Sequence, residues 1–303
     1  MEYALAGVID GQHRLFAFAI AGEKDPLLLN TELICSVFID LPKPFQAQLF
    51  ATINSTQKPV DKSLTYELFG YNISEETEDY WSPDKLAVFL ARKLNSESES
   101  SLKDRIIIAP QNEIEEGRLG KTGTLDWKLS MATIVEGILR LISSNPKRDT
   151  AELMTPKQQT RSILLDSNRK DRSPLRNLYV EGNDQLLYLL VRNFLSAANQ
   201  VLWTKANKGS FIIKTVGIQA LLDILRKLCV EALEKKDISV DYFVIRISPV
   251  ASIDFGHESF RDASGSGRGR IRRFIEAKIG LLKLDTLSPE DELHELVAKF
   301  QNS

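Results

Sequence analysis

Cysteine is scarce in this 303-residue chain, and the little that is present forms no pattern. The two cysteines, Cys35 and Cys229, stand far apart in apolar surroundings, with no CxxC motif or Cys/His cluster near them. That spacing argues against a disulfide framework and against a metal site. We expect both thiols to be buried, reduced and structural, because a free cysteine commonly behaves as a small apolar residue.

An excess of charge of one sign is also missing, since 39 Lys and Arg face 41 Asp and Glu, for a formal net charge of -2. Any affinity for nucleic acid must therefore come from a local basic patch. The chain has no apolar run of about 18 residues, and it does not begin with a basic segment followed by a cleavable apolar stretch. We therefore expect a cytoplasmic protein with no membrane partner.

The composition is otherwise that of a folded globular protein, with 43% hydrophobic and 26% charged residues. Short apolar runs between turn residues characterise the first 110 positions. Residues 3–9 and 32–41 have the pattern of buried strands, and residues 104–110 that of a further short strand. Residues 11–21 are apolar nearly all round, which predicts a buried helix, and residues 82–95 predict a capped helix.

From residue 128 onwards, apolar residues recur at every third or fourth position. This spacing predicts long helices over residues 129–144, 184–203 and 215–236. The stretch 238–250 is ambiguous, because its β-branched residues favour a strand whereas its position between helices does not.

The change of character predicts two domains with a boundary in the turn-rich stretch 112–124. We expect residues 1–120 to form an α/β lobe and residues 121–303 to form a mainly helical domain, so that the fold class is α+β.

The stretch GVIDGQHRLFAFAIAG, residues 7–22, places five polar or small residues between two apolar runs. At a corner between strand and helix, the free N–H groups of the first helical turn favour an anion. Gly11 allows close backbone approach, and the planar guanidinium of Arg14 suits phosphate. His13 adds a donor or an acid–base group.

A plainer interpretation fits the same spacing. Asp10 would be an ordinary N-cap, Gly11 would ease the turn, and Gln12, His13 and Arg14 would be exposed residues of the first turn. The spacing alone does not separate the two interpretations.

The segment VIDGQHRLFAF resembles the signature of the DGQHR-domain proteins, which include the DndB proteins of bacterial DNA phosphorothioation systems and relatives in other DNA-modification gene clusters. FATINSTQKPVDKSL, residues 50–64, is similar to an F-x-x-I-N-x-x-Q-K-P segment of that family. Residues 193–225 match the helical C-terminal half of the family more loosely. The resemblance therefore covers most of the chain, with specific motifs in the first 65 residues.

That family is similar to the ParB and sulfiredoxin fold, in which a helix N-terminus carries a G-x-x-R-like motif over nucleotide phosphates. The resemblance implies an NTP with Mg²⁺ as cofactor, in a lobe that is short at its N-terminus. The implied nucleotide-binding residues come from both motifs and are Asp10, Gly11, Gln12, His13, Arg14, Asn54, Gln57 and Lys58. For a hydrolysed nucleotide, the implied catalytic residues are Asp10, His13 and Arg14.

A second candidate site lies in ASGSGRGRIRRFIEAKIGLL, residues 263–282, which has helical spacing after its glycines. Four arginines crowd the start of this helix, where the dipole disfavours cations: Arg268, Arg270, Arg272 and Arg273. A phosphate of DNA or of a nucleotide would relieve the conflict. A solvated Arg-Gly loop is the alternative interpretation.

Three functions follow from these features. The first is a DndB-like accessory or regulatory protein of a DNA-modification or defence system, with DNA and other proteins of that system as partners. The second is an NTPase of the ParB/sulfiredoxin type, whose turnover would be slow because the sequence has no Walker A lysine and no evident pair of carboxylates. The third is an interaction module with no ligand of its own. Self-association stays open in all three.

Overall fold

The computed structural model describes residues 11–39, 62–63, 66, 76–107, 127–154, 159–165 and 171–300. The predicted strand over residues 3–9 lies outside these ranges. The chain divides into two units, Met1–Val60 and Asp61–Ser303. None of the described helices combines the length and the apolar composition that a bilayer crossing requires.

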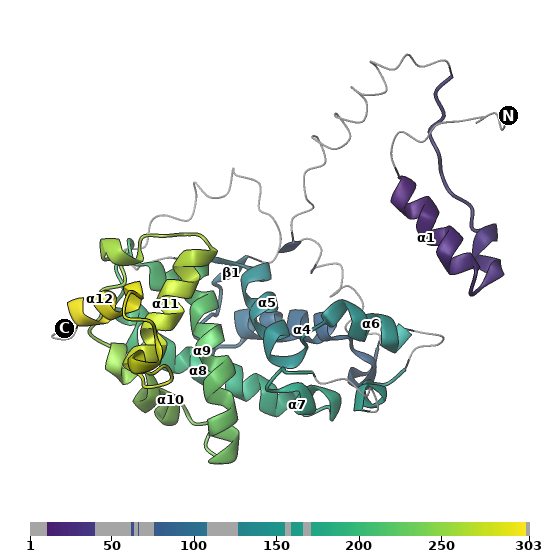
Figure 1. The fold of residues 1–303 in the computed structure, drawn as a ribbon. Coiled ribbons are helices and arrows are strands. Elements are labelled where there is room, and N and C mark those ends of the chain that lie inside the picture. The colour runs from purple at the N-terminus through teal and green to yellow at the C-terminus, as the bar shows by residue number, and fades with distance from the viewer. Residues whose placement is uncertain are drawn as a thin grey trace. The chain divides into compact units, whose positions relative to one another are not determined.

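In the first unit, helix α1 (Gln12–Gly22) confirms the helix predicted over residues 11–21, and a 3-10 helix (Pro26–Asn30) packs on it (Figure 1). The predicted burial of α1 is wrong, because Phe16 and Ile20 are exposed. Within the described part of this unit, the 3-10 helix is too short to cover an apolar surface on all sides.

The second strand, predicted over residues 32–41, is also wrong for the part described, since residues 32–39 form no strand. A strand needs a hydrogen-bonded neighbour, and the described residues of this unit offer none. Cys35 lies in this stretch and is exposed, which corrects the prediction that it is buried. The same prediction is confirmed for Cys229, and burial raises the pKa of the Cys229 thiol to about 12.

The second unit is mainly helical. Its α-helices are α4 (Pro83–Ser96), α5 (Met131–Ile142), α6 (Pro146–Met154), α7 (Arg176–Val180), α8 (Asp184–Val201), α9 (Thr215–Glu234), α10 (Val240–Ile247), α11 (Gly265–Lys278) and α12 (Glu292–Lys299). Its 3-10 helices span Glu78–Tyr80, Arg161–Leu165, Trp203–Lys205, Phe211–Ile213, Ser248–Val250, Glu258–Phe260 and Leu284–Thr286. Strands β1 (Ile106–Ile107) and β2 (Leu129–Ser130) pair in parallel, with Ile106 opposite Leu129.

This content agrees with an α+β fold that is mostly helical. The predicted long helices are confirmed as α5, α8 and α9, and α10 shows that the ambiguous stretch is helical. The predicted strand over residues 104–110 is confirmed at β1. The predicted division near residue 120 falls outside the described ranges and inside the second unit, and α4 and α5 on either side of it pack together.

Helix starts in this unit follow from their capping residues. Ser82, Ser130 and Ser239 each stand before a helix, and their hydroxyls accept a first-turn backbone N–H at 3.1–3.3 Å. Pro83 then occupies the first position of α4, where its missing N–H costs nothing. Each cap is worth about 1 kcal/mol.

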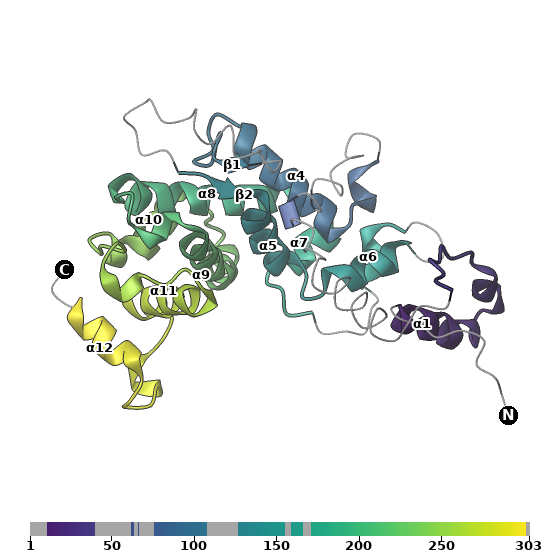
Figure 2. The same cartoon turned by 90° about the horizontal axis from the view of Figure 1, so that it is seen from above.

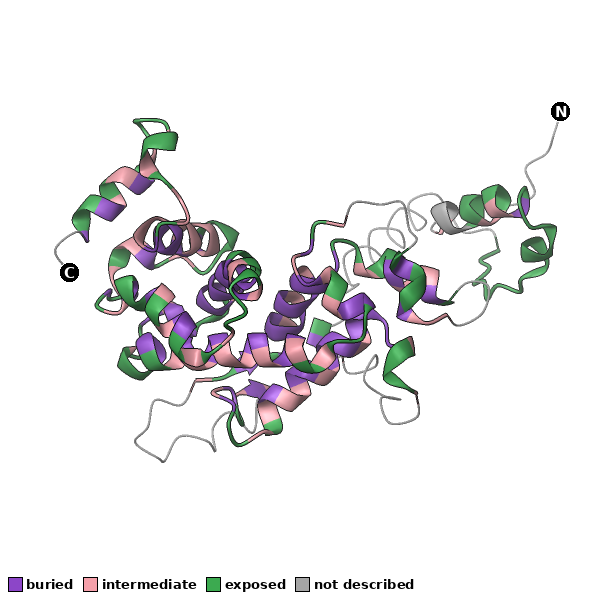
Figure 3. Ribbon diagram, turned by 90° about the horizontal axis from the view of Figure 1, so that it is seen from below, coloured by how far each residue is buried: buried purple, intermediate pink, exposed green. Residues whose placement is uncertain are grey.

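Helix α9 is central to the second unit and packs on α5, α8 and α11 (Figure 2). Its side chains Ile218, Leu221 and Leu225 are fully buried, and each contributes about 1.5–3 kcal/mol. Helix α5 approaches α9 closely at Gly137, where a Cβ would lie 2.1 Å from Leu222 Cδ1. Figure 3 shows the result, with buried residues on the inner sides of the helices and exposed residues outside.

Arg161 is a charged residue inside this core. The side chain of Arg161 is 2% exposed, and its guanidinium meets the carboxylate of Asp184, at the start of α8, at 2.6 and 2.8 Å. It also donates to the carbonyls of Tyr179 and Glu78 at 3.1 and 2.5 Å. This arginine therefore ties two 3-10 helices to α7 and α8.

Candidate functional site

The DGQHR motif lies at the start of α1. Gly11 is the N-cap residue, with φ 89° and ψ 6°, a left-handed conformation that favours glycine. No side-chain cap is present among the described residues there. The plainer interpretation had Asp10 as the N-cap, whereas the cap position belongs to Gly11.

The other residues of the predicted nucleotide site lie wholly or partly outside the described part of the structure. Asp10, Asn54, Gln57 and Lys58 lie outside the described residues. Gln12, His13 and Arg14 belong to the first turn of α1, but their side chains lie outside the described part of the structure. What the structure contributes to this site is a helix N-terminus preceded by a left-handed glycine.

The arginine-rich segment forms helix α11, as predicted, and its own side chains cap it. The hydroxyl of Ser264 accepts Ser266 N at 3.2 Å, and Asp262 accepts Ser264 N at 2.8 Å and Ser266 Oγ at 2.5 Å. These bonds lower the pKa of Asp262 to about 2. A carboxylate of the chain itself therefore lies at the positive end of the helix dipole. Gly267 is required here, since a Cβ would lie 1.9 Å from Asp262 O.

The four predicted arginines divide between two sides of α11, because residues four apart share a face and residues two apart do not. Arg268 and Arg272 turn toward α9. The guanidinium of Arg268 makes two bonds of 2.7 Å with Asp223, and Arg272 Nε lies 3.7 Å from Glu276 Oε1.

Arg270 and Arg273 turn toward α12 instead. Arg273 Nη2 lies 2.5 Å from Asp291, and this ion pair lowers the pKa of Asp291. Arg270 Nη2 lies 3.6 Å from Glu292, whose side chain is largely exposed. The conflict between arginines and helix dipole is therefore relieved in part by carboxylates of the same chain.

These two arginines line a cleft between α11 and α12 of about 650 Å³, which we call the α11–α12 cleft. Lys299 adds a third cation to its wall, and Glu292 and Glu295 add carboxylates. An anion that binds Arg270 in the cleft must compete with Glu292, which lies 3.6 Å from Arg270 Nη2. With Asp291 paired to Arg273, three cations and three carboxylates meet at the cleft, so its charge is close to balanced.

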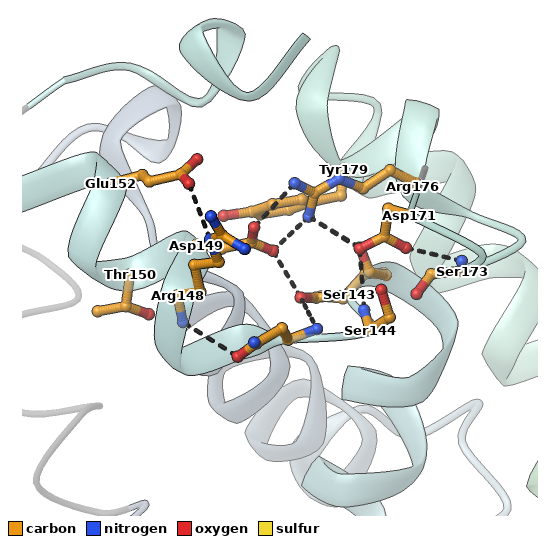
Figure 4. A network of polar contacts seen from close by, with 12 residues as sticks. Ser143, Ser144, Arg148, Asp149, Thr150, Glu152, Asp171, Ser173, Arg176 and Tyr179 are labelled. Carbon is orange, nitrogen blue, oxygen red and sulfur yellow. Dashed lines mark hydrogen bonds and ion pairs between the residues drawn. The ribbon is translucent and has the colours of Figure 1, made fainter. Parts of the chain in front are cut away.

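A second cavity, of about 670 Å³, lies where α5 ends, beside α6 and α7 (Figure 4). Asp149 accepts hydrogen bonds from both terminal nitrogens of Arg176, the Nη2 bond being 2.9 Å long. Ser143 Oγ donates to the same carboxylate at 2.5 Å. Although burial opposes it, Asp149 raises the pKa of Arg176.

Other polar groups of this cavity form hydrogen bonds and an ion pair of their own. Asp171 accepts Ser144 N at 3.0 Å and Ser173 N at 2.7 Å, and these bonds outweigh burial and lower the pKa of Asp171. Arg148 Nε lies 3.3 Å from Glu152. We interpret the network as structural, since it joins the end of α5 to α6 and α7.

The described residues contain no group of three or more His, Cys, Asp and Glu that could hold a metal ion. His257 caps the 3-10 helix Glu258–Phe260, and its ring lies edge-on to Phe300, so we interpret it as structural. His294 is half-buried, and its Nε2 contacts Ser288 O at 3.1 Å.

Several cations near Arg268 were not among the site residues predicted from the sequence. Arg140 of α5 shares Asp223 with it at 3.4 Å, and Arg226 and Lys227 lie on α9. These residues are distant in sequence, and the only local signal is a basic pair inside an apolar helix.

Comparisons with protein-family models, with curated proteins and with solved structures find no match to this chain. The similarity to the DGQHR-domain family therefore stays a prediction from the motifs at residues 7–22 and 50–64.

Proposed function

We propose that this chain is a DndB-like, DNA-binding accessory or regulatory protein of a bacterial DNA-modification or defence system. In this proposal the first unit belongs to a ParB/sulfiredoxin-like lobe, which holds nucleotide phosphates at Asp10–Arg14. DNA binds through arginines of α11. The protein acts in the cytoplasm, together with other proteins of the system.

The proposed nucleotide site is supported by the conformation of Gly11. Gly11 is left-handed and provides no side chain to cap α1, and the first-turn N–H groups of a helix commonly bind phosphate. The same observation supports the second candidate, a slow NTPase with Mg²⁺. Release of inorganic phosphate from an NTP separates the enzyme from the regulatory protein.

The observation that carries the proposed DNA binding is the arginine density of α11. Four guanidinium groups lie within six residues of α11, and ion pairs with Asp223 and Asp291 connect this helix to the rest of the unit. Guanidinium forks match phosphate oxygens, and phosphate contacts supply most of the affinity of proteins for DNA. This density is what the overall charge of -2 requires of a DNA-binding protein.

Replacing Arg268, Arg270, Arg272 and Arg273 together by alanine tests the DNA binding. We expect weaker binding of a short duplex and a flatter plot of log affinity against log salt, by roughly 0.9 for each phosphate that the variant no longer neutralises. Asp223 keeps Arg140, and Glu276 keeps Lys227, so the variant should remain folded. An unchanged slope would mean that α11 does not contact DNA.

A further inference from the structure

The side of α11 that faces α9 belongs to a larger charged surface. Helix α9 packs against both α5 and α11 (Figure 2). Asp223 of α9 pairs with cations of α5 and α11, and Glu276 of α11 pairs with cations of α9 and α11. We call this surface the basic face, and its five cations are Arg140, Arg226, Lys227, Arg268 and Arg272.

Asp223 holds two of these cations from below. Its side chain is 10% exposed and accepts both bonds from Arg268 at 2.7 Å, while Arg140 Nε lies 3.4 Å away. One carboxylate therefore neutralises two guanidinium groups incompletely. Burial lowers the pKa of Arg140, and the charge of Arg268 lowers it further.

Glu276 holds two more cations of the basic face from beneath. Its side chain is 4% exposed, with Lys227 Nζ at 2.9 Å and Arg272 Nε at 3.7 Å. Lys227 and Arg272 themselves are 47% and 41% exposed. The carboxylates thus lie beneath the cations, and the charge turned toward solvent is positive.

Arg226 adds a further positive charge. It is exposed and donates to the carbonyl of Arg172 at 3.5 Å, and no carboxylate of the described residues forms an ion pair with it. Glu136, the other carboxylate that acts on Arg140, forms an ion pair with Lys62, whose Nζ lies 2.5 Å from Glu136 Oε1. The basic face therefore has five cations and two carboxylates, which leaves it with an excess of three positive charges.

The α11–α12 cleft has no comparable excess of positive charge. Arg270, Arg273 and Lys299 lie close to Asp291, Glu292 and Glu295, and Lys299 also reaches Glu258 at 3.8 Å. Carboxylates are at least as numerous as cations there, and Glu292 and Glu258 are largely exposed. The electrostatic attraction of a polyanion is therefore weak at that surface and strong at the basic face.

We propose that the basic face is the surface that binds the phosphate backbone of duplex DNA, an inference that rests on the DNA-binding function proposed above. Its buried carboxylates hold Arg268 and Arg140 in place before DNA arrives, which reduces the side-chain entropy lost on binding. The bound phosphates neutralise the positive charge that Asp223 and Glu276 leave unmatched. Binding through this face is independent of base sequence.

The test removes two charges from the basic face without stranding a buried carboxylate. In Arg226→Gln/Arg272→Gln, Asp223 keeps Arg140 and Arg268, and Glu276 keeps Lys227. With a short duplex, the log–log salt slope should become flatter by about 1.8. Between about 50 and 200 mM salt, the wild type should then lose about tenfold more affinity than the variant.

Two matched variants remove the same charge elsewhere. Arg148→Gln/Lys235→Gln removes two cations from i,i+4 ion pairs and should leave the slope unchanged. Arg270→Gln/Arg273→Gln removes the cations of the α11–α12 cleft and should change the slope less than the basic-face variant does. If the cleft variant changes it as much or more, the inference is overturned while the DNA-binding function stands. A wild type that fails to bind duplex at low salt overturns the proposed function itself.

Discussion

Asp184→Asn should lower the free energy of unfolding by about 3–5 kcal/mol, because it leaves the Arg161 guanidinium buried without its carboxylate. The substitution keeps the size of the side chain and removes only the charge. The two carbonyls that Arg161 also contacts cannot neutralise it. Urea unfolding of the full chain, followed by circular dichroism, measures the loss.

The matched control is Asp241→Asn, which also removes an aspartate from the first turn of a helix, but an exposed one. Asp241→Asn should lower the free energy of unfolding only by the helix-dipole contribution of about 0.3–1 kcal/mol. The double variant Arg161→Met/Asp184→Leu should recover most of the stability, since it buries no unpaired charge. Equal losses for the two single variants would show that Arg161 does not depend on Asp184.

Arg14→Ala should abolish the rise in melting temperature that an NTP with Mg²⁺ produces in the wild type. A ligand at 100 times its Kd stabilises a protein by about 2.7 kcal/mol, so the wild-type shift is readily measured. We expect the substitution to change the stability of the free protein by less than about 0.5 kcal/mol, the usual range for a substitution that disturbs no packed side chain. Gly11→Val should also remove the shift, with added strain because φ is 89°.

Lys24→Ala is the control for this experiment, because it removes an exposed cation from the same unit outside the motif. It should leave the nucleotide-dependent shift unchanged. If millimolar nucleotide does not shift the wild type, or if Arg14→Ala shifts as the wild type does, the motif does not hold phosphate in this chain.

Helices were predictable from the sequence because their apolar spacing is local. The periods in residues 184–203 and 215–236 correspond to α8 and α9 within a few residues. The strand expected at residues 32–41 failed because a strand depends on a neighbour that can be far away in the chain. The exposure of Cys35 could not be predicted either, because its burial was inferred from the apolar residues next to it in the sequence.

The candidate site was predictable only where its residues are neighbours in sequence. The run of arginines in α11 marks a basic helix, but it does not show that Arg268 and Arg270 lie on different sides with different partners. Arg140 and Lys227 join Arg268 and Arg272 only through the packing of α5 and α11 on α9. No spacing along the chain encodes that arrangement.

The most direct test of DNA binding at the basic face is acylation of lysines in the native protein, with and without duplex DNA, read by mass spectrometry. Lys227 on the basic face, Lys299 in the α11–α12 cleft and Lys235 at the end of α9 have similar exposed fractions, 47%, 49% and 57%. DNA should protect Lys227 and leave Lys235 and Lys299 as reactive as before. Protection of Lys299 without Lys227, or of neither lysine while DNA is bound, would contradict the account.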